Sequence, residues 1–182
     1  SNLIEAVTDV YDERRALYML KKRFIIWKTM FKRDSVGKLS REIIQGLFGE
    51  LYFMKKYMLD RFGAAVAVQA WSGPDAKSKD YAVDTEWFEV KTVGANTTTV
   101  HISSLAQLSS DHDGHLIVVK AEAMSDQFSN GESSIEELFN YILMQINDES
   151  AEELFLRKLS LLGFDVSDGN FAAKFDVKSM TL

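Results

Sequence analysis

The fold is decided by the stretch Asp80-Tyr81-Ala82-Val83-Asp84-Thr85-Glu86-Trp87-Phe88-Glu89-Val90-Lys91. Its aromatic and β-branched residues predict two short β-strands, and Asp84-Thr85 supplies a tight turn between them. With that turn as a two-residue loop, Asp80 lies opposite Glu89. A turn shifted by one residue places Asp80 opposite Lys91 on the same face. Because Glu89 and Lys91 are two residues apart, their side chains share a face, which therefore gathers two carboxylates and an ammonium group.

These three side chains suit metal-assisted phosphodiester hydrolysis. Carboxylates about 5 Å apart repel each other unless a positive charge lies between them. Mg²⁺ prefers oxygen ligands and is typically held by one or two carboxylates plus substrate phosphate. A lysine beside the ion can orient the attacking water or stabilise the negative charge of the transition state. A surface salt bridge across a hairpin is the alternative interpretation of the same residues.

Four short motifs occur in a characteristic order: Gly49-Glu50-Leu51, Trp71-Ser72-Gly73-Pro74, Lys79-Asp80-Tyr81 and Glu89-Val90-Lys91-Thr92. They resemble the PD-(D/E)XK nuclease superfamily, and most closely the PD-(D/E)XK-motif proteins of prokaryotic restriction and phage-defence loci. The resemblance covers roughly residues 40 to 125. It implies an α/β fold with a restriction-endonuclease-like α-β-β-β-α-β core and a mixed sheet. It also implies Mg²⁺-dependent cleavage of DNA, with Mn²⁺ as a substitute metal.

The resemblance implies roles for individual residues. Asp80 and Glu89 would bind the metal, and Lys91 would orient the attacking water. Asp75 is the literal Asp of the motif's Pro-Asp pair, but it precedes the predicted strand. Asp80 is favoured because it lies on the strand and on the face of Glu89. Gln107 resembles the glutamine that many related nucleases carry on the helix after the E-x-K motif.

Glu50 interrupts an apolar stripe on a predicted helix. The stripe consists of Ile43, Leu47 and Met54. A carboxylate among apolar residues is costly unless it is paired or bound to a metal. We therefore expect a third carboxylate that completes the metal shell, as the first-helix Glu does in many members of the superfamily. A boundary glutamate paired with a nearby Lys or Arg is the alternative. Gly46 and Gly49 predict a close approach of this helix to the sheet.

The N-terminal half has further helix signals. Residues 3–33 predict one long, partly basic helix, and Ser40 is expected to cap the next, which runs to Phe62 and stops at Gly63. Residues 64–71 predict a short helix or a continuation, and Trp71 is expected to be a buried anchor beneath the site. Lys79 could contact phosphates or be solvated.

The C-terminal half completes the predicted elements. We expect strands over 97–102 and 116–121. The turn 111–115 carries several potential ligands, but ligands set so close together rarely form a closed metal site. Capping boxes are predicted at Ser133/Glu136 and Ser150/Glu153, and a hairpin around Asp168-Gly169 has 171–177 as its second strand.

The 182 residues predict a single domain made of a helical extension (1–39), a catalytic core (40–125) and C-terminal helices with a hairpin (126–182). The chain lacks cysteine, a cleavable signal and an apolar membrane span, so we expect a cytoplasmic protein without membrane contact. It opens without methionine, so we expect a piece of a longer protein. The net charge of −6 opposes nucleic-acid binding, but residues 1–40 carry +4, which leaves −10 for the rest.

The sequence therefore predicts an Mg²⁺-dependent DNA endonuclease of a restriction or phage-defence system. Its expected partners are double-stranded DNA and either a second copy or a larger defence complex. The alternative is a catalytically inactive DNA-binding or assembly subunit with the same fold, which the long basic first helix favours.

Overall fold

A computed structural model describes residues 39–73, 79–102, 112–124, 134–163 and 173–182. The chain divides into two compact units, Ser1–Gly37 and Lys38–Leu182, and every described residue belongs to the second. Several predicted features lie outside the described residues: the long first helix, Asp75, Gln107 and the turn at Asp168-Gly169. Among the described residues, no helix is long and apolar enough to cross a membrane.

The first described helix begins and ends where the sequence predicts. At its start, Ser40 Oγ accepts a hydrogen bond from the Ile43 backbone N–H at 3.4 Å, which satisfies one of the free donors of the first turn. It ends at Gly63, whose φ of +79° is a conformation that glycine adopts at little cost. A π-helical turn interrupts its middle. The segments are α2 (Arg41–Phe53), η1 (Met54–Met58) and α3 (Leu59–Phe62), and the short helix α4 (Ala64–Ala70) follows as predicted.

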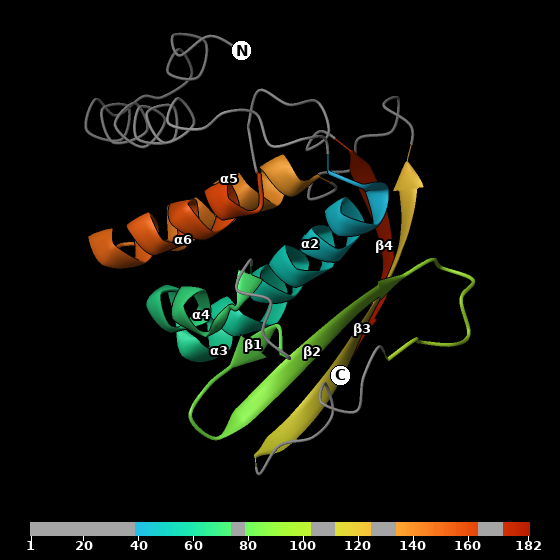
Figure 1. The fold of residues 1–182 in the computed structure, drawn as a ribbon, viewed down its shortest axis with the longest axis horizontal. Helices are drawn as coiled ribbons and strands as arrows, with labels where there is room; N and C mark the ends of the chain where they lie inside the picture. The colour runs from blue at the N-terminus through green and yellow to red at the C-terminus, as the bar shows by residue number, and fades with distance from the viewer. Residues whose placement is uncertain (1–38, 74–78, 103–111, 125–133, 164–172) are drawn as a thin grey trace, which may run out of the picture. The chain divides into compact units, whose positions relative to one another are not determined.

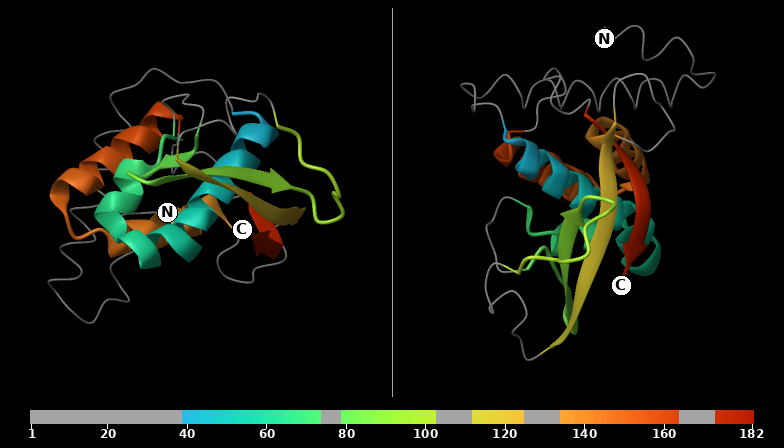
Figure 2. Two further views of the ribbon diagram at one scale, coloured as in Figure 1. Left: turned by 90° about the horizontal axis from the view of Figure 1, so that it is seen from below. Right: turned by 90° about the vertical axis from the view of Figure 1, so that its right-hand side faces the viewer.

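The predicted hairpin is confirmed. β1 (Tyr81–Ala82) pairs antiparallel with β2 (Glu86–Val93), and the Val83 N–H donates to the Glu86 carbonyl at 2.9 Å across the turn. β2 runs parallel to β3 (Asp113–Met124), which pairs antiparallel with β4 (Lys174–Thr181). The result is a mixed sheet of order β1-β2-β3-β4, as Figure 1 and the right-hand view of Figure 2 show. The predicted α/β class is therefore confirmed.

The strand predicted over 97–102 is wrong. These residues form no strand, and the Thr97 N–H donates to the Gly94 carbonyl at 3.0 Å in a turn. An alternating pattern forms a strand only where a neighbouring strand pairs with its backbone. In the described sheet the neighbours of β2 are β1 and β3, and residues 97–102 pair with no strand. The strand predicted over 116–121 is part of β3, which is longer at both ends.

The C-terminal helices are present, but their caps differ from the prediction. The capping box of the first is formed by Ser134 and Glu137, one residue later than predicted. The second is capped by Asp148, whose Oδ1 accepts a backbone N–H of the first turn at 2.7 Å. Ser150 donates its hydroxyl to the same carboxylate, so an earlier and stronger acceptor displaced it as the cap. These helices are α5 (Ile135–Gln145) and α6 (Glu149–Leu161).

Helix α2 packs on β2, α5 packs on α2, and α6 packs on α4 (Figure 1). The close approach of α2 depends on Gly49, where a Cβ would lie 1.8 Å from Thr92 Oγ1 of β2. A Cβ on Gly46 would meet nothing within 4 Å, so the predicted role of Gly46 is wrong. Ile43 is 48% exposed, and Ile44 takes its place on the buried side of α2.

Candidate active site

The register of the hairpin places Asp80 opposite Glu89, as predicted. Asp80 itself lies just before β1, which corrects the prediction that it is part of the strand. Its Oδ2 accepts the Val90 N–H at 2.7 Å. Backbone N–H groups lie in the plane of a sheet, so the Asp80 carboxylate occupies the edge of β2 where β1 has ended. Its backbone carbonyl accepts the Ser72 N–H at 2.7 Å, which fixes Asp80 from the opposite side.

Glu89 and Lys91 form an ion pair on β2, with Lys91 Nζ 2.8 Å from Glu89 Oε1. This contact confirms that the two side chains share a face. Glu89 is 1% exposed, and within the described part of the chain its Oε2 has no hydrogen-bond partner. A buried carboxylate oxygen without a donor is costly, and a cation would satisfy it.

Glu50 reaches the site from α2. Its Oε2 accepts the indole N–H of Trp71 at 2.6 Å, and its backbone carbonyl accepts the Tyr81 hydroxyl at 2.8 Å. Trp71 is completely buried, which confirms its predicted role as an anchor. Leu47 and Met54 are buried on either side of Glu50 along the helix, so the acid does interrupt an apolar stripe. The indole takes the place that the alternative interpretation gave to a lysine or arginine.

Neighbouring acids contribute to the raised pKa of Glu50 and of Asp80. Burial raises the pKa of Glu50 to about 8, the charges of Asp80 and Glu89 raise it as well, and the Trp71 hydrogen bond and Lys91 oppose the rise. Burial also raises the pKa of Asp80 to about 6, with the Val90 N–H opposing and Glu89 contributing. Carboxyl groups that shift one another in this way lie close together in a poorly solvated region. Full ionisation of the acids in this site is therefore unfavourable unless a cation is present.

Lys79 brings a second ammonium group near the acids. Its Nζ lies 3.6 Å from the centroid of the Trp87 ring, a cation–π contact. Burial lowers the pKa of Lys79, and the charge of Glu89 acts in the opposite direction. The Trp87 ring in turn covers Gly114 of β3, where a Cβ would lie 1.9 Å from the indole. In the sequence, the only indication that Lys79 lies near the acids was its position next to Asp80.

The donor set fits a hard divalent cation in its chemistry, because every candidate ligand atom is a carboxylate oxygen and Glu89 Oε2 is buried without a donor. As the side chains lie, however, no group of three or more His, Cys, Asp or Glu residues in the described ranges could hold a metal ion. Each acid has a partner from the protein instead: Asp80 the Val90 N–H, Glu50 the Trp71 indole and Glu89 the Lys91 ammonium. The shell of Asp80, Glu89 and Glu50 stays a prediction.

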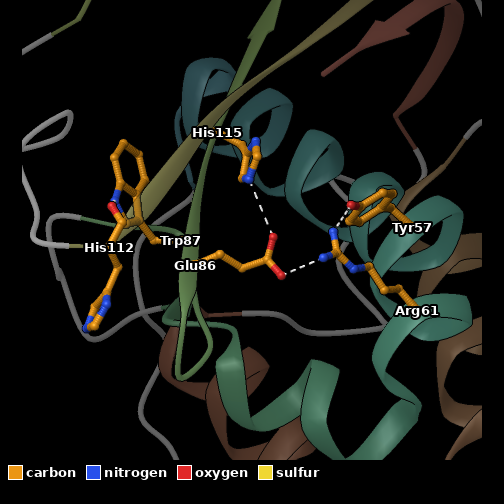
Figure 3. A network of polar contacts seen from close by, with 6 residues as sticks. All are labelled: Tyr57, Arg61, Glu86, Trp87, His112 and His115. Carbon is orange, nitrogen blue, oxygen red and sulfur yellow. Dashed lines mark hydrogen bonds and ion pairs between the residues drawn. The ribbon is translucent and has the colours of Figure 1, made fainter.

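A separate polar network lies at the start of β2 (Figure 3). Glu86 contacts Arg61 of α3 at 2.7 Å and His115 of β3 at 3.4 Å, and Arg61 also donates to the Tyr57 hydroxyl. Glu86 and Glu89 are three residues apart and therefore point to opposite faces of β2. The network ties α3 to two strands, on the other face of β2 from Glu89.

Over residues 1–182 the chain matches the family described as "Putative PD-(D/E)XK family member, (DUF4420)". Searches of curated proteins and of solved structures gave no match. The family match agrees with the E-x-K motif of Glu89 and Lys91 and with the mixed sheet that presents it. The chain therefore belongs to this PD-(D/E)XK family, whose fold is nuclease-like.

Proposed function

We propose that this chain hydrolyses phosphodiester bonds of DNA with the help of Mg²⁺ or Mn²⁺. The observation that supports this most is the placement of Asp80 opposite Glu89, whose Oε2 is buried without a hydrogen-bond donor among the described residues. The raised pKa of Glu50 and of Asp80 agrees with it. Carboxylates that repel one another in a poorly solvated site are stabilised by a cation. Membership of a PD-(D/E)XK family supports the same chemistry.

Asp80 and Glu89 would hold the ion, and Glu50 would complete or support its shell. A bound divalent cation supplies an activated water and neutralises charge on the phosphate. Glu89 can offer Oε2 while Oε1 keeps its contact with Lys91. Asp80 is anchored through Oδ2 to the Val90 N–H, so its Oδ1 is the atom we assign to the ion.

Lys91 would orient the attacking water and stabilise the negative charge of the transition state. Its side chain is 22% exposed, and the contact with Glu89 holds its ammonium group beside the acids. The group is thus positioned before substrate arrives, which lowers the cost of ordering it during the reaction.

The proposed substrate is double-stranded DNA, and the proposed setting is a prokaryotic restriction or phage-defence system. Both come from the motif resemblance. A homodimer or a larger defence complex is the proposed assembly.

A catalytically inactive DNA-binding or assembly subunit is the second candidate. The lack of a three-acid metal group among the residues that the structure describes favours it.

The test of catalysis is nicking of supercoiled plasmid DNA by the full chain with Mg²⁺ or Mn²⁺. The variants Asp80→Ala and Lys91→Ala should lower the rate on the order of 10²-fold or more, because each removes a group that acts on the reacting atoms. The matched control is Asp84→Ala, an exposed acid in the turn of the same hairpin, which should cleave like the wild type. Full metal-dependent activity in either site variant would discard the assignment.

A gel shift with Ca²⁺ in place of Mg²⁺ separates the two candidates. A shift together with cleavage in Mg²⁺ supports the nuclease. A shift without cleavage supports the binding subunit.

A further inference from the structure

Lys158 is a buried lysine of α6 that the chemistry proposed above does not use. It is 6% exposed, and its Nζ donates to the backbone carbonyls of Val68 at 3.1 Å, Gln69 at 3.4 Å and Trp71. These carbonyls form the C-terminal end of α4. A lysine from one helix therefore caps the end of another.

The end of α4 requires such a group. The last carbonyls of a helix have no partner within it, and the helix dipole makes this end negative. α4 has no basic residue in its own last turn. Because α6 packs against α4, the Lys158 ammonium group can bind the last carbonyls of α4 while both stay shielded from water. The carbonyls in return compensate the burial of the ammonium group.

Trp71, whose carbonyl accepts a hydrogen bond from Lys158, lies next to two of the three candidate metal ligands, Glu50 and Asp80. Its indole N–H donates to Glu50 Oε2 at 2.6 Å. The following residue, Ser72, donates its N–H to the Asp80 carbonyl at 2.7 Å. Trp71 also forms an isolated antiparallel bridge with Tyr81. The Lys158 ammonium group and the Glu50 carboxylate are thus connected through Trp71 by two hydrogen bonds.

We propose that Lys158 is a positioning residue for the active site: it fixes Trp71, and Trp71 fixes the carboxylate of Glu50. The role of Glu50 in this statement rests on the proposed function, whereas the chain of contacts does not. A lysine that merely stabilises α4 would lower the stability of the fold and leave the indole of Trp71 in place.

The first test reads the indole directly and needs no catalytic activity. The chain has three tryptophans, so protein with ¹⁵N-labelled tryptophan gives few indole N–H signals, and Trp71→Phe identifies that of Trp71. Lys158→Met should shift this signal and speed its exchange with water, and so should Glu50→Ala, which removes the acceptor of the indole N–H. Lys178→Met, an exposed lysine of β4, is the matched control and should leave the signal unchanged. An unchanged Trp71 signal in folded Lys158→Met would overturn the proposal.

The second test is a double-mutant cycle on the cleavage rate. Because both residues act along one path, Trp71→Phe and Lys158→Met should each slow cleavage about tenfold, and the double variant should be scarcely slower than either. Lys158→Arg, which keeps the charge, should recover part of the rate. Effects that multiply to about a hundredfold would show that the two residues act separately. If the wild type does not cleave DNA, the proposed function fails and the indole signal alone decides the role of Lys158.

Discussion

Replacing Glu50 by Gln should stabilise the fold at neutral and alkaline pH. Gln keeps a carbonyl oxygen for the Trp71 indole N–H but carries no charge at any pH. The pKa of Glu50 is raised from 4.5 to about 8, chiefly by burial. A group whose pKa is raised by folding contributes stability that is present below its unfolded pKa and is lost as the pH rises through the folded one. The wild type should therefore lose stability between pH 4.5 and about 8, and the variant should lose less.

The size of the effect follows from the same two values. At pH 7 the solution is about 2.5 pH units above the ordinary pKa of Glu, and each unit corresponds to 1.36 kcal/mol, so keeping Glu50 neutral costs about 3 kcal/mol. Glu50→Gln avoids this cost. In both proteins the ionisation of Asp80 also lowers the stability of the fold as the pH rises, because the pKa of Asp80 is raised from 3.8 to about 6. Because the charge of Asp80 contributes to the raised pKa of Glu50, the difference between the two proteins measures Glu50 together with its coupling to Asp80.

The assay is urea unfolding of both proteins without divalent cations, repeated from pH 4 to pH 8. The variant should be about 3 kcal/mol more stable at pH 7 and nearly equal to the wild type at pH 4. Glu153→Gln replaces an exposed acid of α6 and should show no such trend. A variant that is less stable at pH 8, or a difference that does not change with pH, would refute the reasoning.

Two further changes test how the scaffold positions the site. Gly49→Ala places a Cβ 1.8 Å from Thr92 Oγ1, so we expect a loss of about 1–2 kcal/mol in thermal unfolding, after the better helix propensity of Ala is counted. Thr92→Ala should restore the loss in the double variant, and a single variant as stable as the wild type would contradict the close packing. Ser134→Ala removes the capping box of α5 and should cost about 1 kcal/mol of unfolding free energy in urea. An unchanged unfolding midpoint would show that this cap contributes nothing.

The hairpin could be predicted because its signals are local. Aromatic and β-branched residues on both sides of Asp84-Thr85 favour strands, and a two-residue turn fixes the register that places Asp80 opposite Glu89. The helix that starts at Ser40 and ends at Gly63 was predictable for the same reason, since its caps are properties of single residues.

Errors arose where neighbouring residues compete for one role. Ser133 and Ser134 are adjacent, and the geometry of the chain, which the sequence does not contain, selects Ser134 as the cap. Asp148 displaced Ser150 in the same way. Asp80 was expected to point from one face of the sheet. The early end of β1 lets it bond the Val90 N–H at the edge of β2 instead.

Contacts between distant parts of the chain could not be predicted from one sequence. Glu50 was recognised because an acid in an apolar stripe needs a partner, but the pattern does not name Trp71 as that partner. Lys158 lies 87 residues from Trp71, in a helix whose sequence carries no catalytic motif. Such a contact follows from the packing of α6 on α4, which no local pattern specifies.

The central claim is that Glu50, Asp80 and Glu89 together bind a divalent cation, and a calorimetric titration of the full chain with Mn²⁺ tests it most directly. We predict saturable binding that is lost in Glu89→Gln, which replaces a buried carboxylate, and kept in Asp84→Asn, which changes an exposed one. Saturable binding that persists unchanged in Glu89→Gln, or no saturable binding to the wild type, would contradict the claim.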